Sequence, residues 1–586
     1  MSSNIDEIKN KKKEWEEKVL KPALDGFGYT EPPFRTYTPT DIEDFDFLDK
    51  VGFPGQYPFT AGIYAVQARM PAPRVGRPRA SRRSQSQAIE QRRAAGYSGY
   101  GTAEDTRDYY KEMISRGGRG GPNLAFDLPT QCGYDSDNPI VRGDVGKTGV
   151  TVDTLRDFEI IYEPYQGELD LDRIASNFTI NAPANIFIAM YCALADKRGI
   201  PFERLRATPQ NDILKEFIAR GTYIFPPKPS MRMFRDSMVF LTKYCPRVNL
   251  TSIGGYHIRG AGATREQDLA FSLVILAAYL QEGINAGLDI DTFAPRFTIN
   301  QFGGSMELFK EVAFHRASRR MWAKVIKEKF GAKNERSMLL RGGGLAAHIG
   351  CENTTIQRPI NNLTRSVIGA VASALSGGGG VAYPPYDEPI RMGGSLEASQ
   401  LSSDASRIIQ YEAKLGEVRD PLAGSYYIES LTNEIEEAAW KEFEKIEAMG
   451  GAVAAIENGY MWREIARSAH DRQRRLETGE DLMVGVNCFV SENELELEIK
   501  RLVPDTYDPV RREQAEEKQI RDLTELKKQR DNRAVAQLLS ELKEKAKKED
   551  ENLIPHFIEC AKAYVSEQEM CDVLREVFGE YQPVSL

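Results

Sequence analysis

Two adjacent side chains that can bind or move protons, Tyr256 and His257, follow a short apolar run in this sequence. The run 248–253 predicts a buried strand, the two glycines after it predict a turn, and a helical pattern begins at Arg265. A strand that presents polar residues at its carboxyl end and then gives way to a helix is typical of a βα-loop active site. The alternative is a core histidine beside a tight turn.

Other candidate strands also end in polar residues. Gln210 follows a β-rich run, and Arg220 lies near the end of the short helical pattern after it. An arginine in such a place suits a carboxylate, because its planar fork binds two oxygens. The sequence has no Ser/His/Asp spacing, phosphate-binding loop, dinucleotide motif or metal-ligand cluster. Positioning groups without an evident nucleophile fit an enzyme whose difficult chemistry belongs to a cofactor.

The elements that must position these residues alternate along the chain. Short β-rich runs predict strands at 124–127, 176–181, 205–210, 248–253, 296–300, 337–341 and 380–383. Helical patterns between them include 184–198, 213–220, 271–283, 306–330 and 363–375. This β-then-α alternation predicts an α/β protein with a (β/α)8 TIM barrel.

The predicted strands carry small polar residues where barrel strands usually have Val, Ile and Leu. They are Thr179, Asn181, Thr208, Thr251, Ser252, Thr298 and Asn300. Small polar side chains inside a barrel leave a bore rather than a filled core, and a bore could admit a long thin ligand.

The composition limits the class of protein. The 586 residues are 41% hydrophobic and 28% charged, as in folded globular proteins, and the formal net charge of −9 argues against nucleic-acid binding. No apolar run approaches the roughly 18 residues of a membrane span, and the start lacks the apolar region of a secretory signal. Seven scattered cysteines without a CxxC pair indicate a reducing cytoplasm and no zinc site.

Changes in composition predict four regions. Residues 1–60 form an N-terminal helix and extended arm, 61–400 the barrel, 401–508 its helical completion and 509–586 a C-terminal helical linker region. The segment 69–93 is unusual, because it holds eight arginines against one glutamate. Either a solvated loop or a site for an anionic ligand or partner would explain it.

Many stretches together resemble the methylmalonyl-CoA mutase family, in particular the large, catalytic subunit of coenzyme-B12-dependent acyl-CoA mutases. The resemblance runs from about residue 30 to the C-terminus, and the matches keep their order. They include Tyr57–Tyr64, Gly99–Glu104, Phe126–Leu128, Gly133–Pro139, Gln210–Phe217, Tyr223–Arg232, Gly255–His257, Phe293–Arg296, Asp420–Tyr427 and Gly485–Asn487.

The resemblance implies a TIM barrel with coenzyme A threaded through its centre and a radical mechanism that uses adenosylcobalamin. An adenosyl radical takes a substrate hydrogen, the thioester carbonyl group migrates to the adjacent carbon, and the hydrogen returns. By this resemblance, His257 and Tyr256 are catalytic: His257 hydrogen-bonds the migrating carbonyl, and Tyr256 packs against the adenosyl group and helps to drive homolysis.

The resemblance also implies the binding residues. Tyr97 and Arg220 match the pair that holds the free carboxylate of methylmalonyl-CoA, and Glu388 matches a carboxylate that binds the adenosyl ribose. The implied substrate-binding residues are Tyr97, Gln210, Arg220, Thr208, Tyr64 and Arg296; Gln210 positions the acyl group, and Tyr64 and Arg296 contact coenzyme A. No metal ligand is expected in this chain.

Departures from the family pattern gather near the implied acyl pocket. The segment Gly342–Leu345 replaces a polar Thr-His-Ser-Gln stretch, Asn300 replaces an aromatic residue, and Val381–Pro384 replaces Leu-His-Thr-Asn. Smaller or less polar groups at these positions favour a larger or more apolar dicarboxylic acyl-CoA than methylmalonyl-CoA, such as an alkyl- or aryl-substituted succinyl-CoA.

The sequence lacks the Asp-x-His-x-x-Gly motif with which the family's cobalamin-binding domain supplies the lower cobalt ligand. A separate small cobalamin-binding subunit is therefore expected, in a heterodimer or heterotetramer, with no nucleic-acid or membrane partner. Two other functions stay open. A mutase for isobutyryl- or hydroxyisobutyryl-CoA is disfavoured by Tyr97 and Arg220, and a non-catalytic barrel scaffold is disfavoured by Tyr256, His257 and Gln210.

Overall fold

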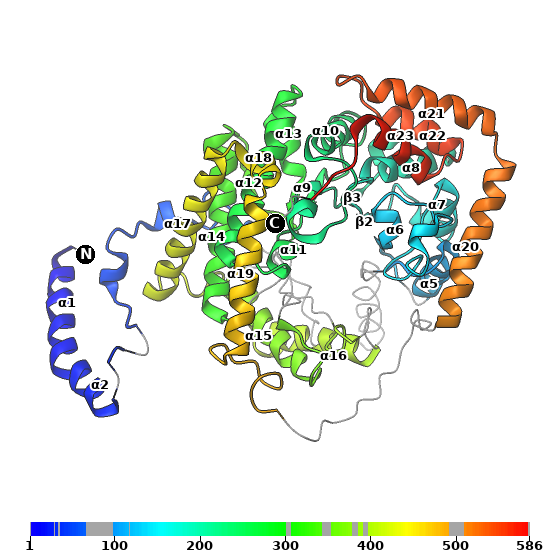
Figure 1. Ribbon diagram of the computed structural model, residues 1–586. Coiled ribbons are helices and arrows are strands. Elements are labelled where there is room, and N and C mark those ends of the chain that lie inside the picture. The colour runs from blue at the N-terminus through cyan, green and yellow to red at the C-terminus, as the bar shows by residue number, and fades with distance from the viewer. Residues whose placement is uncertain are drawn as a thin grey trace, which may run out of the picture.

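The computed structural model describes residues 2–28, 30–32, 35–65, 98–115, 118–300, 306–342, 353–377, 385–390, 396–415, 417–490 and 509–583. Tyr97, the Arg-rich segment 69–93, the predicted strand 380–383 and most of the departures after residue 342 lie outside these ranges. Most of the described chain is helical, and short parallel strands lie among the helices (Figure 1).

The described strands all pair in parallel. One sheet contains β1 (Asn123–Ala125), β2 (Ser176–Thr179) and β3 (Ala207–Pro209) in that order, and a second contains β4 (Thr251–Ile253) and β5 (Phe297–Ile299). The two sheets are continuous through backbone hydrogen bonds: Asn249 N donates to Ala207 O at 2.9 Å, and Ser252 N donates to Gln210 O at 2.8 Å. The spatial order of the strands is therefore their order in the sequence.

Backbone pairing extends this order at both ends. Ala125 N in β1 donates to Ser98 O at 2.6 Å, and Ile299 N in β5 donates to Arg341 O at 2.9 Å. Parallel neighbours in sequence order, separated by helices, are the pattern of a (β/α)8 barrel. The described residues establish the mostly helical α/β class and the parallel order, and closure into a barrel stays a prediction.

Long helices follow the strands. They are α8 (Ala184–Lys197), α10 (Pro227–Tyr244), α12 (Arg265–Asn285) and α14 (Leu308–Lys324). The α12 helix begins where the sequence has a capping box, in which the Thr264 side chain accepts from Gln267 N and the Gln267 side chain accepts from Thr264 N. The α8 helix is buried along most of its length, because α22 (Ile554–Lys562) packs on the side away from the strands.

Burial alternates along β2 and β3, whereas every residue of β4 and β5 is buried. In β2, Ser176 and Phe178 are buried, whereas Asn177 and Thr179 are partly exposed. In β3, Thr208 is the partly exposed residue and pairs with Asn177. Since successive side chains point to opposite faces of a strand, the polar residues share one face and Phe178 faces the helices.

Two local predictions were wrong. Tyr256 and His257 lie in a short helix, α11 (Gly255–Gly260), rather than in a turn, because Ala261 N donates to His257 O and a glycine costs little at the first helical position. The predicted strand 337–341 begins inside a 3₁₀ helix, η9 (Glu335–Met338), which the Asn334 side chain caps. The predicted helix 213–220 is confirmed as α9 (Ile213–Lys215) followed directly by a π-helical turn, η6 (Glu216–Arg220).

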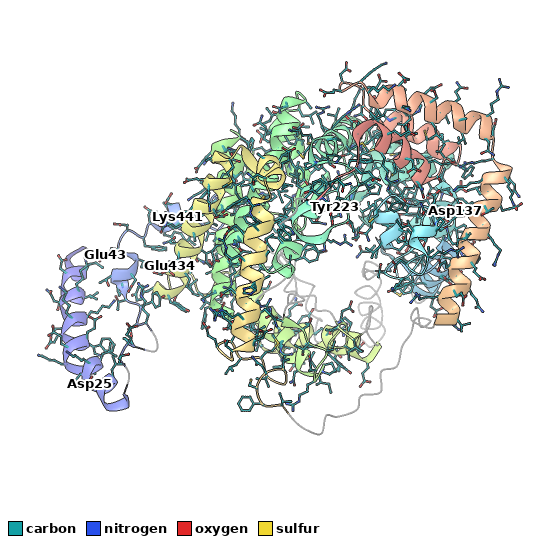
Figure 2. The ribbon with its side chains drawn as sticks, in the orientation of Figure 1. Asp25, Glu43, Asp137, Tyr223, Glu434 and Lys441 are labelled. Atoms are coloured by element: carbon teal, nitrogen blue, oxygen red, sulfur yellow. The ribbon has the colours of Figure 1, made fainter. Side chains whose placement is uncertain are left out.

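The N-terminal segment is more helical than an extended arm. It contains α1 (Ser2–Trp15), the π-helical turn η1 (Glu16–Leu20), α2 (Lys21–Phe27), η2 (Pro39–Ile42) and α3 (Phe47–Lys50). The α1 helix projects from the rest of the molecule (Figure 1). An ion pair of 2.8 Å between Lys9 and Glu43, which is labelled in Figure 2, ties α1 to the segment that follows η2.

The C-terminal half is helical, as predicted. Its helices are α15 (Asn361–Leu375), α16 (Leu396–Arg407), α17 (Tyr426–Ala448), α18 (Gly451–Glu457), α19 (Tyr460–Glu477), α20 (Pro509–Gln529), α21 (Asn532–Ala546), α22 and α23 (Glu567–Phe578). Buried side chains of α21, α22 and α23 belong to the same hydrophobic core as the strands. Asp137, labelled in Figure 2, accepts a hydrogen bond of 2.9 Å from Lys527 of α20. The four predicted domain boundaries stay predictions.

Two features of the described ranges bear on the protein class. None of their helices combines the length and the apolar character needed to cross a membrane. Six cysteines lie within them, and all six are free thiols.

Candidate active site

The candidate site lies where β3 and β4 end. Gln210 directly follows β3, and Gly254 and α11 directly follow β4. The two loops are held together because Ser252 N donates to Gln210 O and the Thr251 hydroxyl donates to the same oxygen at 3.0 Å. Carboxyl ends of neighbouring parallel strands meet at one edge, so the predicted grouping of Gln210 with His257 follows from the strand order.

The Gln210 side chain is fixed by two donors. Its Oε1 atom accepts from Asn181 Nδ2 and from Lys215 Nζ, both at 2.9 Å. Lys215 is fully buried and also donates to Glu216 Oε1. Burial lowers the pKa of Lys215, and the neighbouring Glu216 carboxylate opposes that shift.

Arg220 lies at the end of η6, four residues after Glu216. Its Nη1 atom is 3.6 Å from Glu216 Oε1, beyond hydrogen-bond distance, and this buried nitrogen has no hydrogen-bond acceptor among the described residues. The Glu216 carboxylate is held from its other side by Thr222, whose N and Oγ1 atoms donate at 3.0 and 2.7 Å. Arg220 is thus anchored by charge and keeps a donor for a ligand.

Gly254 allows the β4 loop to approach its neighbours closely. A Cβ atom at this position would lie 3.0 Å from His257 Nδ1 and 3.1 Å from Cε of Lys215. The Asp212 carboxylate accepts from Gly254 N at 2.7 Å and from the Tyr279 hydroxyl at 2.8 Å, which fixes the loop. Burial raises the pKa of Asp212 to about 6, although Lys215 and the hydrogen bond from Gly254 oppose the shift.

His257 is held uncharged by its surroundings. Burial lowers its pKa well below the usual value, and the positive charges of Lys215 and Arg220 lower it further. The Nδ1 atom has no hydrogen-bond partner among the described residues. The ring lies against that of Tyr256, with centroids 3.9 Å apart and planes inclined by 38°. A neutral imidazole in this position can donate a hydrogen bond to a carbonyl oxygen through its protonated ring nitrogen.

Thr208 and Arg296 lie further along the strands. Thr208 Oγ1 accepts from Asn249 Nδ2 at 2.8 Å, two residues before Gln210 on the same strand. Arg296 directly precedes β5, at the strand end opposite to the His257 cluster. Its Nη1 atom donates at 3.1–3.3 Å to three carbonyl oxygens in and just after α10, those of Leu241, Cys245 and Val248. Burial lowers the pKa of Arg296 to about 10. Its described partners are structural, and its predicted contact with coenzyme A stays a prediction.

The other described candidates, Tyr64 and Glu388, lie on segments distant in the sequence from β3 and β4. Tyr64 is 49% exposed and lies near Arg341, whose pKa it affects. Glu388 is in the turn at 386–390, and Tyr97 lies outside the described residues. No group of His, Cys, Asp and Glu side chains in the described ranges could hold a metal ion.

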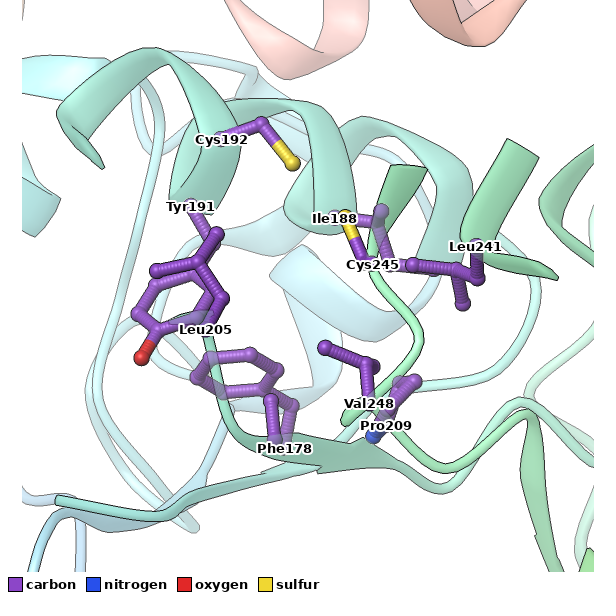
Figure 3. A pocket seen from close by; sticks show the side chains of 10 residues that line it. Phe178, Ile188, Tyr191, Cys192, Leu205, Pro209, Leu241, Cys245 and Val248 are labelled. Carbon is purple, nitrogen blue, oxygen red and sulfur yellow. The ribbon is translucent and has the colours of Figure 1, made fainter. Parts of the chain in front are cut away.

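A small cavity on the helix side of β2 and β3 is distinct from this cluster (Figure 3). Its volume is about 10 Å³, and its lining residues include Phe178, Ile188, Leu205, Cys192 and Cys245. A space of this size holds one water molecule at most, so the cavity is a packing defect of the core rather than a ligand site.

Three buried charged residues of the site were not predicted from the sequence: Asp212, Lys215 and Glu216. Two adjacent opposite charges in a short helical pattern are typical of a solvated surface. The neighbours of Lys215 and Glu216 in the sequence could have indicated burial. Ile213-Leu214 precede the two charged residues and Phe217-Ile218 follow them, so that apolar residues surround the charges.

Parallel strands in sequence order, with polar side chains gathered in the loops at their carboxyl ends, define the class of α/β proteins that hold their sites in βα loops. The model of the family described as methylmalonyl-CoA mutase matches residues 32–580. The chain therefore belongs to the methylmalonyl-CoA mutase family, whose members are mutases and hence isomerases.

Known relatives agree with this family. The chain is 37% identical to the 2-hydroxyisobutanoyl-CoA mutase large subunit of Aquincola tertiaricarbonis over 94% of its own length and 91% of that subunit. It is 34% identical to the methylmalonyl-CoA mutase of Rhizobium meliloti, over 98% of this chain and 76% of the relative. It is 37% identical to the mitochondrial methylmalonyl-CoA mutase of Mus musculus over 83% of its length, and it spans 63% of that protein.

Proposed function

We propose that the chain is the catalytic subunit of an adenosylcobalamin-dependent mutase that moves the thioester carbonyl group of a carboxylated acyl-CoA to the adjacent carbon. One observation carries the proposal. Gln210, Arg220 and His257 gather at the ends of β3 and β4, and Arg220 Nη1 and His257 Nδ1 are buried without a hydrogen-bond partner among the described residues. Buried polar atoms in proteins nearly always have partners, so these two atoms fit a site that a polar ligand completes.

Each group suits one part of such a substrate. Arg220 binds the free carboxylate, since its charge and planar donors match two oxygens. His257 donates to the thioester carbonyl, and its depressed pKa keeps the imidazole neutral at neutral pH. Gln210 positions the acyl chain between them. Tyr97, which lies outside the described residues, is proposed as the second contact of the carboxylate.

The polar faces of β2 and β3 suit the coenzyme A part of the substrate. Asn177, Thr179 and Thr208 are the partly exposed residues of β2 and β3. We infer that they line the interior of a TIM barrel through which the coenzyme A chain reaches the strand ends. Tyr64 and Arg296 are proposed coenzyme A contacts nearer its nucleotide.

Adenosylcobalamin, when bound, supplies the radical that starts this rearrangement. The residues present fit such a group. Tyr256 is partly exposed beside His257, so its ring can lie between the substrate and a planar group above the site. Glu388 is proposed to bind the adenosyl ribose. We infer that the lower cobalt ligand comes from a separate small cobalamin-binding subunit, because the relative that matches over 91% of its length is named a large subunit.

A second substrate class has support of its own. The relative from Aquincola tertiaricarbonis is named for 2-hydroxyisobutanoyl-CoA, which has no free carboxylate. Arg220 favours a carboxylated substrate here, because its buried Nη1 atom has no hydrogen-bond acceptor among the described residues and lies 3.6 Å from the Glu216 carboxylate, beyond hydrogen-bond distance. The replacements at Asn300 and in 342–345 and 381–384 favour an acyl group bulkier than methylmalonyl, such as an alkyl- or arylsuccinyl group.

The proposal is tested by supplying the chain, its small subunit and adenosylcobalamin with four thioesters: methylmalonyl-CoA, a 2-alkylsuccinyl-CoA, a 2-arylsuccinyl-CoA and 2-hydroxyisobutyryl-CoA. Mass spectrometry and chromatography of the products detect isomers of unchanged mass. We expect isomerisation of a carboxylated thioester that requires all three components, with a succinyl derivative faster than methylmalonyl-CoA. Isomerisation of 2-hydroxyisobutyryl-CoA alone would assign the second class, and no isomerisation of any thioester would favour a scaffold.

A further inference from the structure

The Lys215 side chain is a fully buried cation beside the candidate site. Its side chain has no exposed surface, and neither does that of its ion-pair partner, Glu216. The ammonium donates to Gln210 Oε1 at 2.9 Å and to Glu216 Oε1. A buried ion pair often stabilises a fold no better than apolar residues of similar volume would. Its presence at this place therefore suggests a role other than stability.

The ammonium determines how the Gln210 carboxamide is oriented. An ammonium group can only donate hydrogen bonds, so the atom of Gln210 that faces Lys215 must be the carbonyl oxygen. Asn181 Nδ2 donates to the same oxygen at 2.9 Å, and its other acceptor is Glu216 Oε1 at 2.7 Å. A flipped carboxamide would place its NH2 group against two donors. Gln210 is thus locked with Nε2 as the donor that remains for a ligand.

The Glu216 carboxylate joins the two halves of the site. Its Oε1 atom accepts from Lys215 and Asn181, which hold Gln210, and lies 3.6 Å from Arg220 Nη1. Its Oε2 atom is held by Thr222. A single carboxylate therefore sets the position of the glutamine that faces the acyl group and of the arginine that faces the carboxylate.

We propose that the buried Lys215–Glu216 pair is a positioning device that locks Gln210 as a hydrogen-bond donor to the acyl thioester and fixes its distance from Arg220. This inference rests on the proposed acyl-CoA mutase function. Neither residue touches the substrate, and both act through Gln210 and Arg220. Lys215 also lies beside His257, because Cε of Lys215 and Nδ1 of His257 lie against the same face of Gly254, where a Cβ atom would be 3.1 and 3.0 Å from them.

A double-mutant cycle on the reconstituted enzyme tests the device. We expect Lys215→Met to lower kcat/KM about 100-fold, since a small misplacement of a catalytic or orienting group has effects of this size. If Lys215 acts through Gln210, its replacement should matter little once Gln210 is absent. Adding Lys215→Met to Gln210→Ala should then lower kcat/KM by less than about a further threefold. Additive losses in the double variant would overturn the proposal.

A neutral pair separates positioning from folding. Lys215→Met leaves Glu216 without its closest cation, so this variant is prone to unfold. The variant Lys215→Met with Glu216→Gln removes both charges of the closest ion pair, so we expect its melting temperature to lie above that of Lys215→Met and near that of the wild type, while kcat/KM stays about 100-fold low. Recovery of turnover together with stability would show a purely structural role. Lys197→Met, which removes a surface ion pair with Glu159, is the matched control.

The titration of His257 gives a readout that does not depend on turnover. Lys215 is one of the charges that lower the pKa of His257. Nuclear magnetic resonance of labelled histidine should therefore show this pKa rise in the neutral pair, and Lys197→Met should leave it unchanged. An unchanged His257 titration in the neutral pair contradicts the proposed placement of Lys215. A wild-type enzyme that isomerises no acyl-CoA would instead refute the proposed function and leave this titration result intact.

Discussion

His257 illustrates how surroundings rather than identity set the role of a residue. The imidazole is flanked by two cations, Lys215 and Arg220, and burial is the largest cause of its low pKa. A histidine of this kind does not serve as a general acid near neutral pH, because its charged form is too unstable. It is suited to donate a hydrogen bond to a carbonyl on which charge develops.

Replacement of His257 by alanine tests this role. We expect His257→Ala to lower kcat by about 10²–10³-fold, the usual cost of losing one donor to a developing charge. Binding of the thioester, measured by calorimetry, should change much less. Turnover equal to that of the wild type would exclude the role assigned to His257.

The pH dependence gives a second sign of the same environment. Because the folded pKa of His257 lies well below 6.5, its protonation should not reduce kcat between pH 8 and 6. Two results together would contradict a buried neutral imidazole. They are a fall of kcat in the wild type with a pKa near 6.5, and the absence of that fall in His257→Ala.

At the residue scale the sequence predicted part of the site. Gln210 and His257 could be grouped because each follows a β-rich run, and successive parallel strands end at one edge. Lys215 and Glu216 could not be recognised, because two adjacent opposite charges after a strand resemble a solvated helix start. Their burial depends on Asn181 and Thr222, which reach them from separate segments.

At the scale of elements, helix α23 begins at a buried acidic residue. Glu567, its first residue, is fully buried, and neither carboxylate oxygen has a hydrogen-bond partner among the described residues. Burial raises its pKa well above the usual value, and nearby carboxylates raise it further. The titratable groups that face it are Asp127, Asp135, Asp153, Cys571 and Arg575.

The sign of the resulting pH dependence follows from proton binding. Because the folded pKa of Glu567 is raised, the folded protein binds more protons than the unfolded chain, and stability is lost as the pH rises through that folded pKa. Glu567→Gln should therefore raise the free energy of unfolding at pH 8 by about 1–3 kcal/mol and flatten its dependence on pH. Urea unfolding at several pH values measures both effects.

Glu569 on the same helix is the matched control. Burial disfavours its ionised form, but hydrogen bonds from Arg530 and Ser566 outweigh burial and lower its pKa. Glu569→Gln should thus destabilise the protein at pH 8. If Glu567→Gln and Glu569→Gln change the free energy of unfolding at pH 8 in the same direction, Glu567 is not a protonated acid without a hydrogen-bond partner.

The positions of helices and strands could be predicted where the local pattern of apolar residues determines them. The strands β2 to β5 fall within the predicted β-rich runs, β1 begins one residue before its predicted run, and α8 begins at the predicted residue, Ala184. The π-helical turn that ends in Arg220 was not predictable. Its geometry depends on Phe217, which packs against Tyr223 and against Tyr581, a residue more than 360 positions away.

In the whole molecule, the C-terminal end of the described chain braces the site. Tyr581 lies edge-on to both Phe217 and Tyr223, with ring centroids 4.7 Å away in each case, and its backbone N donates to Ile224 O at 3.0 Å. Tyr223, near the centre of Figure 2, follows the turn that holds Arg220. The tail thus supports the proposed carboxylate-binding arginine without touching the substrate.

Loss of this aromatic contact should loosen Arg220. We expect Tyr581→Ala to raise KM for a carboxylated thioester about fivefold, which corresponds to about 1 kcal/mol of lost aromatic packing. Tyr581→Phe retains the ring and should behave as the wild type. Equal KM values for Tyr581→Ala and the wild type would show that the tail does not support the site.

The most direct test of the central claim is the ratio of kcat/KM for a carboxylated acyl-CoA to that for the same thioester without its free carboxylate. It is measured on the reconstituted enzyme with wild-type Arg220 and with Arg220→Gln. The wild type should favour the carboxylated thioester by at least about 100-fold. Arg220→Gln should abolish most of that preference, because removal of one partner from a desolvated charge pair costs about 2–5 kcal/mol. A wild-type preference for the thioester without the carboxylate, or a preference unchanged by Arg220→Gln, would contradict the proposed substrate class and the role of Arg220.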